Sequence, residues 1–177
     1  KIFGWGWYYL STILDDYSRY IVTWKLCSTM KAEDVKDTLD EALLASNVPE
    51  KNRPKLLSDN GSCYISHELA EYMKDKDMKH VRGRPLHPQT QGKIERYHRS
   101  MKNIVKLDNY FSPGQLEEKM KEFVYYYNFE RYHESLKNVT PAEVYFGTAN
   151  RKIKQRKMTK NRTLKARKKQ YQKINLN

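Results

Sequence analysis

The chain has 177 residues, of which 38% are hydrophobic, and this length and composition fit one compact domain with an extension. Its formal charge is +13, from 34 Lys and Arg against 21 Asp and Glu. No run of about 18 apolar residues occurs, so we expect no transmembrane helix and no membrane partner. Cys27 and Cys63 lack a CxxC or His partner at zinc spacing, which favours a reduced, cytoplasmic setting without structural zinc.

The first part of the chain predicts a strand hairpin, a helix and a third strand. Residues 7–14 and 20–27 are rich in β-branched and aromatic side chains on either side of a turn sequence, which predicts two paired strands. Thr29 can cap a helix that runs to about residue 46 with apolar residues on one face. The apolar segment KLLS at residues 55–58 predicts a short strand that leads into the turn sequence DNGS.

The second part predicts further helices and one more strand. Ser66 can cap a short helix, and residues 78–82 form a candidate strand. A polar loop follows, and then a long helix to about residue 107. Helical spacing recurs over residues 112–128, and TPAE at 140–143 supplies an N-cap Thr, a first-position Pro and a Glu at N3. This order of elements predicts an α/β fold, a sheet with helices packed on it.

The positive charge is concentrated at the C-terminus. Residues 150–177 hold 12 Lys and Arg and no acid, which leaves 22 Lys and Arg against 21 Asp and Glu in residues 1–149. We therefore divide the chain into a core over 1–149 and a basic tail over 150–177. Such a tail can neutralise phosphates and gain affinity by counterion release, which predicts a nucleic-acid partner. The alternative is a solvated, disordered tail without a specific partner.

Two carboxylates stand out by their positions. Asp59 follows the apolar strand at its carboxyl end, where the ligands of open α/β sheets gather. Glu95 lies near the start of the long helix, and 35 residues separate it from Asp59. Acids at a strand end and on a helix can converge on Mg²⁺, which takes oxygen ligands from carboxylates, water and phosphate. Two such ions can clamp the attacking and leaving oxygens of a phosphoryl transfer.

The residues around Glu95 are mainly basic. On a helix, Arg99 and Lys102 lie four and seven residues beyond Glu95 and share its face. A metal-binding acid flanked by cations suits a nucleic-acid backbone that lies across the site. The alternative is that DNGS is a plain turn and that Glu95 is a surface acid paired with Arg99.

Three segments carry a resemblance to a known family: LLSDNGSCYIS, HPQTQGKIERYHRSMK and YYNFERYHESLKNVTPAEVYFG. They are similar to the integrase core of bacterial insertion-sequence transposases, which are related to retroviral integrases. The resemblance covers roughly residues 5–147, and the spacing of Asp59 and Glu95 matches the DD(35)E arrangement of that family. It implies a ribonuclease-H-like fold, a mixed sheet flanked by helices with a basic C-terminal extension.

The resemblance also implies an activity and its partners. The expected reaction is metal-dependent cleavage and strand transfer of double-stranded DNA, at transposon ends and target sites. Two divalent ions, Mg²⁺ or Mn²⁺, are the expected cofactors. A homo-multimer assembled on DNA is expected, in the bacterial cytoplasm and associated with the nucleoid.

Individual residues take roles by the same resemblance. Asp59 corresponds to the second catalytic, metal-ligating acid and Glu95 to the third. We interpret Asn128, Arg131 and His133, which match the pattern YNxxRxH of the family, as a structural hydrogen-bonding cluster that holds the last helices. The residues expected to contact DNA are Asn60, His87, Gln89, Gln91, Lys93, Arg96, Arg99 and Lys102.

The family's first catalytic acid has no counterpart in this sequence. That acid stands in the middle of a strand in a T-D-x-T-like context, and FGWG at residues 3–6 looks like the turn after that strand. We therefore expect the first, central strand to lie upstream of Lys1, so that the sequence is a fragment and inactive alone. Asp15 and Asp16 are poorer substitutes, because they fall in a turn, where Asp commonly bonds local backbone.

Three functions are therefore weighed for the chain. The first is a transposase or integrase catalytic domain that carries out strand cleavage and strand transfer. The second is a catalytically incomplete, DNA-binding transposase remnant. The third is a nuclease or resolvase of the ribonuclease-H-like fold, which hydrolyses DNA without joining it.

Overall fold

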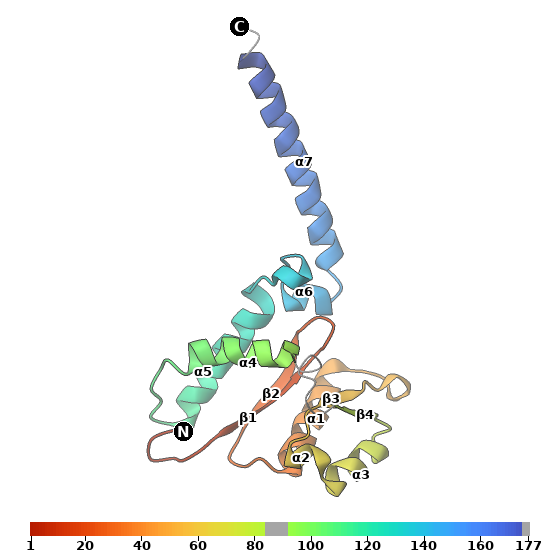
Figure 1. Cartoon of the computed structure of the whole chain (residues 1–177), viewed down its shortest axis with the longest axis vertical. Helices are drawn as coiled ribbons and strands as arrows, with labels where there is room; N and C mark the ends of the chain where they lie inside the picture. Colours follow the sequence, from red (N-terminus) through yellow and green to blue (C-terminus); the bar gives the residue numbers. More distant parts are fainter. Residues whose placement is uncertain (84–91, 175–177) are drawn as a thin grey trace. The chain divides into compact units, whose positions relative to one another are not determined.

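The computed structural model describes residues 1–83 and 92–174, and it divides the chain into two compact units, Lys1–Tyr125 and Tyr126–Asn177 (Figure 1). Each unit is described below by itself. The boundary predicted between residues 149 and 150 was drawn from charge, and it stays a prediction. None of the helices in the described part of the chain combines the length and the apolar character needed to cross a bilayer.

The first unit begins with the predicted hairpin. Strands β1 (Tyr9–Leu14) and β2 (Ile21–Cys27) pair antiparallel, with an irregularity in the register near the end of β1. In the turn between them, Asp15 Oδ2 accepts hydrogen bonds from the backbone N–H of Ser18 at 2.7 Å and from its hydroxyl at 2.5 Å. The interpretation of Asp15 as a turn residue that bonds local backbone is therefore confirmed.

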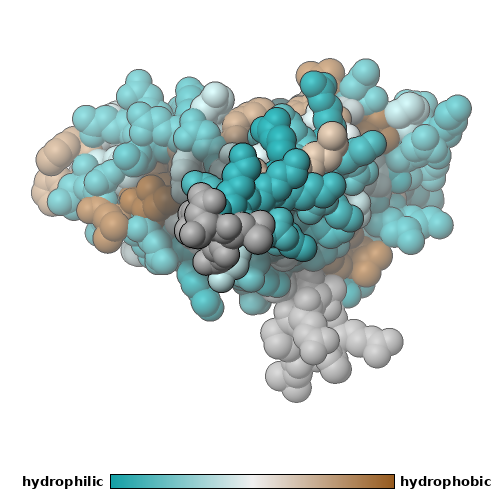
Figure 2. All heavy atoms as spheres, turned by 90° about the horizontal axis from the view of Figure 1, so that it is seen from above, coloured by the Kyte–Doolittle hydropathy of each residue, from teal (hydrophilic) through white to brown (hydrophobic). Residues whose placement is uncertain are grey.

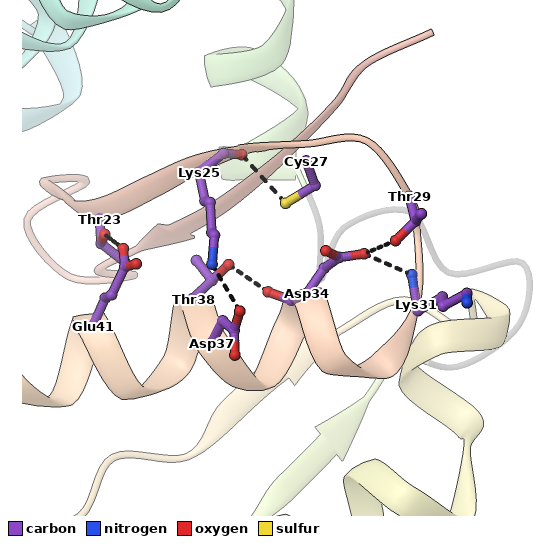
Figure 3. Close-up of polar contacts among 9 residues, drawn as sticks. All are labelled: Thr23, Lys25, Cys27, Thr29, Lys31, Asp34, Asp37, Thr38 and Glu41. Atoms are coloured by element: carbon purple, nitrogen blue, oxygen red, sulfur yellow. Dashed lines mark hydrogen bonds and ion pairs between the residues drawn. The ribbon is translucent and has the colours of Figure 1, made fainter.

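Helix α1 (Ala32–Ser46) packs along the hairpin and ends where the sequence predicted. The predicted N-cap was wrong, because the helix begins at Ala32 and Thr29 lies outside it. The Thr29 hydroxyl instead donates to Asp34 Oδ2 at 2.5 Å, and the backbone N–H of Lys31 donates to the same oxygen at 3.0 Å (Figure 3). Asp34 therefore accepts the backbone N–H of Lys31, the residue before the helix, and this bond stabilises the first turn without a cap from Thr29.

Polar contacts also join α1 to the neighbouring strand β2. Lys25 Nζ donates to Asp37 Oδ2 at 2.7 Å, and Thr23 Oγ1 donates to Glu41 Oε2 at 3.3 Å (Figure 3). The two pairs are four residues apart on the helix and two apart on the strand, which is the spacing at which both elements repeat their faces. They therefore set how α1 lies along β2.

A second pair of strands holds the middle of the unit. After a short 3-10 turn η1 (Glu50–Asn52), β3 (Leu56–Ser58) pairs in parallel with β4 (His80–Arg82). Two helices connect them, α2 (Ser62–Ile65), which the sequence did not predict, and α3 (His67–Asp75). The predicted cap of α3 is confirmed, because the Ser66 hydroxyl accepts the N–H of Leu69 at 3.2 Å.

One hydrophobic cluster of this unit lies between α1 and α3. Its buried side chains are apolar residues that recur at helical spacing on the two helices, together with a methionine that precedes β4. They are Ala32, Val35, Leu39, Leu69, Met73 and Met78. Leu56 of β3 packs against this cluster, and the loop that carries Asp59 follows that strand.

The four described strands form two separate ladders, β1–β2 and β3–β4. The sequence predicted one mixed sheet, and antiparallel and parallel pairing both occur, in β1–β2 and β3–β4 respectively. Helices flank the strands, so the α/β class is confirmed.

Helices α4 (Gly92–Val105) and α5 (Pro113–Tyr125) complete the first unit and pack on each other (Figure 1). Tyr97 of α4 is fully buried, with its ring centroid 6.1 Å from that of Phe123 on α5. Its hydroxyl lies 3.4 Å from the hydroxyl of Thr12 on β1. Tyr97 therefore fixes the rotation of α4 about its own axis.

The second unit is helical. It comprises a π-helical turn η3 (Tyr126–Glu130), a 3-10 turn η4 (Glu134–Leu136), α6 (Pro141–Tyr145) and the long α7 (Ala149–Ile174). The predicted start of α6 is confirmed as a capping box, in which Thr140 Oγ1 accepts the N–H of Glu143 and the Glu143 carboxylate accepts the N–H of Thr140. The alternative of a disordered tail does not hold for residues 149–174, which form α7.

Tyr127 is the centre of the predicted structural cluster in this unit. Its side chain is buried, its ring centroid lies 5.0 Å from that of His133, and the Arg131 guanidinium lies 5.6 Å from the ring centroid. The backbone N–H of His133 donates to the Val139 carbonyl at 3.1 Å. Asn128 is buried next to Tyr127 in the chain. The rings of Tyr127 and His133 and the Arg131 guanidinium therefore pack together, and the hydrogen-bonding role expected of Asn128, Arg131 and His133 stays a prediction.

Candidate active site

Asp59 is the first residue after β3, and its side chain is exposed. Its Oδ1 accepts the backbone N–H of Gly61 at 2.9 Å, which folds the loop back on itself. The Asn60 side-chain amide donates to the Gly83 carbonyl at 3.0 Å, and the Gly83 N–H donates to the Ser58 carbonyl at 2.9 Å. The loop that carries Asp59 is therefore tied to the end of β4, directly before the segment 84–91.

Beneath this loop, Ser58 and His80 bridge the two parallel strands. Ser58 is buried, and its hydroxyl lies 2.8 Å from His80 Nε2 and donates to the Asp59 carbonyl at 2.8 Å. Burial, and secondarily the positive charge of Arg82, lower the pKa of His80. His80 is therefore neutral at physiological pH, where it serves as a hydrogen-bonding partner.

Glu95 stands in the first turn of α4 with its side chain exposed. Among the described residues it forms no ion pair, so the alternative pairing of Glu95 with Arg99 is not observed. At about 100° per residue, Glu95, Arg99 and Lys102 lie within an arc of about 60° on the side of α4 opposite the buried Tyr97. Because Tyr97 fixes the helix, this acid and these two cations face outward together.

Lys93 occupies a different side of α4 from Glu95. Its Nζ donates to both the carboxylate and the carbonyl oxygen of Asp16, at 2.7 and 2.8 Å. Arg96 folds back along the helix, where its Nε donates to the Gly92 carbonyl at 2.9 Å. The four cations predicted to contact DNA therefore differ in their surroundings. Lys93 ties α4 to the hairpin turn, whereas Arg99 and Lys102 share the outward face with Glu95.

His98 lies beside the outward face of α4 and is half-buried. Burial is the main cause that lowers its pKa; Lys102 lowers it further and Glu95 opposes the change. The His98 ring is therefore neutral at physiological pH, and Arg99 and Lys102 are the basic side chains that share the face of Glu95.

Three of the predicted contact residues, His87, Gln89 and Gln91, lie outside the described residues. Within residues 1–83 and 92–174, no three His, Cys, Asp or Glu side chains converge into a group that could hold a metal ion. Asp59 and Glu95 are each exposed and without an ion pair in that part of the chain, and each remains available as an oxygen ligand.

Sequence reasoning missed the residues that position the site from a distance. Asp16, Gly83 and His80 each contact a site residue or its neighbour across many positions in the chain, 77 in the case of Asp16 and Lys93. None of the three has a local pattern that would have revealed the contact.

The fold is that of a retroviral integrase catalytic core. The catalytic core domain of BIV integrase matches 82% of this chain and 90% of its own, with a TM-score of 0.60 and 20% sequence identity. The HTLV-2 integrase catalytic core domain, solved in complex with magnesium in a dimeric form, matches 78% of this chain and 84% of its own, with a TM-score of 0.60 and 18% identity.

Sequence comparison places the chain in the same family. Two family models, both described as integrase core domain, match residues 1–88 and 76–141, and the chain belongs to the integrase core domain family. The Gag-Pro-Pol polyprotein of Mouse mammary tumor virus (strain BR6) is 28% identical over 113 residues, which is 61% of this chain. The matched region is 6% of that polyprotein, so the chain spans a small part of the length of this relative.

Proposed function

We propose that this chain carries part of the catalytic site of a DNA-cleaving and DNA-joining enzyme, with Asp59 and Glu95 as two of its metal-ligating acids. The observation that carries the proposal is the outward face of α4. Glu95 is exposed there on the same face as Arg99 and Lys102, without an ion pair among the described residues, while the buried Tyr97 holds the helix from behind. Family membership and the 35-residue spacing to Asp59 support the same assignment.

The donor chemistry of the two acids fits a divalent cation. Within residues 1–83 and 92–174, Asp59 uses one carboxylate oxygen for the Gly61 N–H and keeps the other, and Glu95 keeps both. Carboxylate oxygens are the ligands that Mg²⁺ and Mn²⁺ prefer. We propose two such ions, which would supply Lewis acidity at phosphate oxygens, and the magnesium in the HTLV-2 integrase structure supports this choice.

The chain's own residues would bind and orient the DNA. Arg99 and Lys102 would hold phosphate groups beside Glu95, since both cations are exposed and share its face. Asn60 and Gly83 would hold the Asp59 loop in position through their hydrogen bond. The remaining proposed contacts to double-stranded DNA are His87, Gln89, Gln91, Lys93 and Arg96.

The proposal is tested by conservative substitution of the two acids. In the protein as its gene encodes it, Asp59→Asn and Glu95→Gln should each abolish Mg²⁺- or Mn²⁺-dependent strand cleavage and transfer on DNA. Both acids are exposed, so the thermal unfolding midpoint should stay unchanged. Full activity in either variant would reject the assignment.

The products distinguish the transposase reaction from its alternatives. A joined strand identifies a transposase or integrase, hydrolysis alone identifies a nuclease or resolvase, and DNA binding without either identifies a catalytically incomplete remnant. We favour strand transfer because the chain belongs to the integrase core family.

The remaining parts of the proposal concern assembly and origin. A homo-multimer on DNA is supported by the dimeric form of the HTLV-2 integrase core. The proposed origin in a bacterial insertion sequence rests on the sequence resemblance alone, and so does the proposed cytoplasmic, nucleoid-associated location. The relative named above is retroviral and does not support either.

A further inference from the structure

Helix α7 concentrates the positive charge of the protein. It contains twelve Lys and Arg side chains and no Asp or Glu, and residues 154–173 are all exposed. The helix extends beyond α6 of its own unit (Figure 1), and hydrophilic side chains prevail on the face seen from that end (Figure 2). A helix without an apolar face has no core of its own to pack on, so its stability and role depend on other contacts.

Two of the cations attach the helix to its own unit. Lys152 forms an ion pair with Glu143 of α6. The Arg156 guanidinium donates to the Asn138 carbonyl and lies 5.3 Å from the centroid of the Tyr132 ring. Because Lys152 and Arg156 are one helical turn apart, they fasten one side of α7 to the segment before it.

Another side of α7 carries a row of cations, which we call the basic row. At about 100° per residue, its six members lie within an arc of about 100°, centred about 130° around the helix from Lys152 and Arg156. Met158 occupies the gap within it. Its length is about 33 Å at a rise of about 1.5 Å per residue. The basic row consists of Arg151, Lys154, Arg162, Lys165, Lys169 and Lys173.

We propose that the basic row binds the phosphate backbone of double-stranded DNA, while Lys152 and Arg156 hold the helix in place. Duplex DNA carries about one negative charge per 1.7 Å of its axis, so a row of about 33 Å faces phosphates along its whole length. The anchored side is occupied by Glu143, Tyr132 and the Asn138 carbonyl, which leaves the basic row facing solvent. The inference rests on the proposed function for the choice of DNA as the partner.

The contacts of the basic row are independent of base sequence. Lysine and arginine side chains on phosphates position a duplex and carry no sequence information. Their binding releases counterions, so the affinity should depend steeply on salt. The row would add affinity for any duplex to the chemistry proposed at Asp59 and Glu95.

The test compares two triple variants that remove the same charges. Affinity of the whole chain for a fluorescent 30-base-pair duplex is measured by anisotropy at several salt concentrations, in EDTA. The row variant Arg162→Gln/Lys165→Gln/Lys169→Gln should reduce the slope of log K against log salt by about 2.7, because each lost phosphate contact removes about 0.9.

The matched control is Lys157→Gln/Lys160→Gln/Arg167→Gln. It also removes one arginine and two lysines, but from sides of α7 outside the basic row. We expect its slope to change by less than about 0.9. Glutamine is a good helix former, and circular dichroism should show equal helix content in both variants.

Contrary outcomes would reject either the role of the basic row or the choice of DNA as its partner. Equal changes in both triple variants would show that net charge, and not the basic row, determines binding. An unchanged slope in the row variant, tighter binding to duplex RNA than to DNA, or an effect on self-association alone would reject DNA as the partner. Because EDTA removes divalent metal, failure here is distinguishable from failure of the activity test on Asp59 and Glu95.

Discussion

Gly61 brings the backbone close to the Asp59 carboxylate. A Cβ at this position would lie 3.0 Å from Asp59 Oδ1, so in Gly61→Ala the carboxylate must shift by a few tenths of an ångström. We expect the dissociation constant for Mn²⁺, measured by titration, to rise about tenfold, or roughly 1.4 kcal/mol. Gly114→Ala is the control, because its Cβ would meet nothing closer than Ser112 Oγ at 3.9 Å. Unchanged affinity in Gly61→Ala would contradict a ligand role for Asp59 in its present position.

His80 makes the stability of the first unit depend on pH. Burial lowers its pKa in the folded protein, so as pH falls through about 6.5 the unfolded chain binds the proton first. The free energy of unfolding should therefore decrease below that pH, measured by urea unfolding at pH 7.5 and 5.5. His80→Gln, which does not titrate, should lose less stability over this interval. Part of the loss will remain, because the pKa of His98 is lowered as well.

Some residues of the site are placed by local sequence patterns, and others by contacts between residues far apart in the chain. Asp59 and Glu95 could be proposed from sequence, because a strand end and a helix start follow from local patterns. The partners that position them could not, because Lys93 meets Asp16 and Asn60 meets Gly83 only after the chain has folded. Such contacts depend on packing between elements and leave no periodic signal.

At the scale of elements, the capping box of α6 is an interaction that can be measured. Thr140 accepts the N–H of Glu143, and Thr140→Ala leaves that donor without its partner at the start of the helix. We expect a loss of about 1 kcal/mol in the free energy of unfolding, measured by urea denaturation. Thr163→Ala on the exposed α7 should stay within about 0.5 kcal/mol of the unaltered protein. Similar losses in both variants would indicate that the cap contributes little.

The elements that the sequence predicted correctly have strong local signals. The hairpin follows from residue type on either side of a turn, and α3 and α6 begin at side chains that cap their first turns. The errors occur where the local signals mislead or are too short. Thr29 is not the N-cap of α1, and its hydroxyl donates to the Asp34 carboxylate instead. Helix α2 is too short to show a periodic pattern of apolar residues.

For the whole molecule, the distribution of charge predicts how binding depends on salt. Residues 150–177 carry 12 of the 34 Lys and Arg, including the six of the basic row. At about 0.9 per phosphate contact, their deletion should reduce the slope of log K for duplex DNA against log salt by at least about five. The measurement is anisotropy over a salt series. The full-length double variant Asp59→Asn/Glu95→Gln should retain the original slope or exceed it, because it loses two negative charges. A truncated chain with an unchanged slope would assign the C-terminal segment to a partner other than DNA.

The sequence by itself determined the α/β class, the order of most elements and the concentration of charge near the C-terminus, and it suggested Asp59 and Glu95 as the candidate acids. These properties depend on neighbours in the chain, on periodicity, and on motif spacing, all of which are local. Only the tertiary structure decided that Tyr97 turns Glu95, Arg99 and Lys102 outward, and that Lys93 is tied to Asp16. It also separated the anchoring cations of α7, Lys152 and Arg156, from the rest. The physical reason is that side chains of the same type acquire different partners only when distant segments pack together.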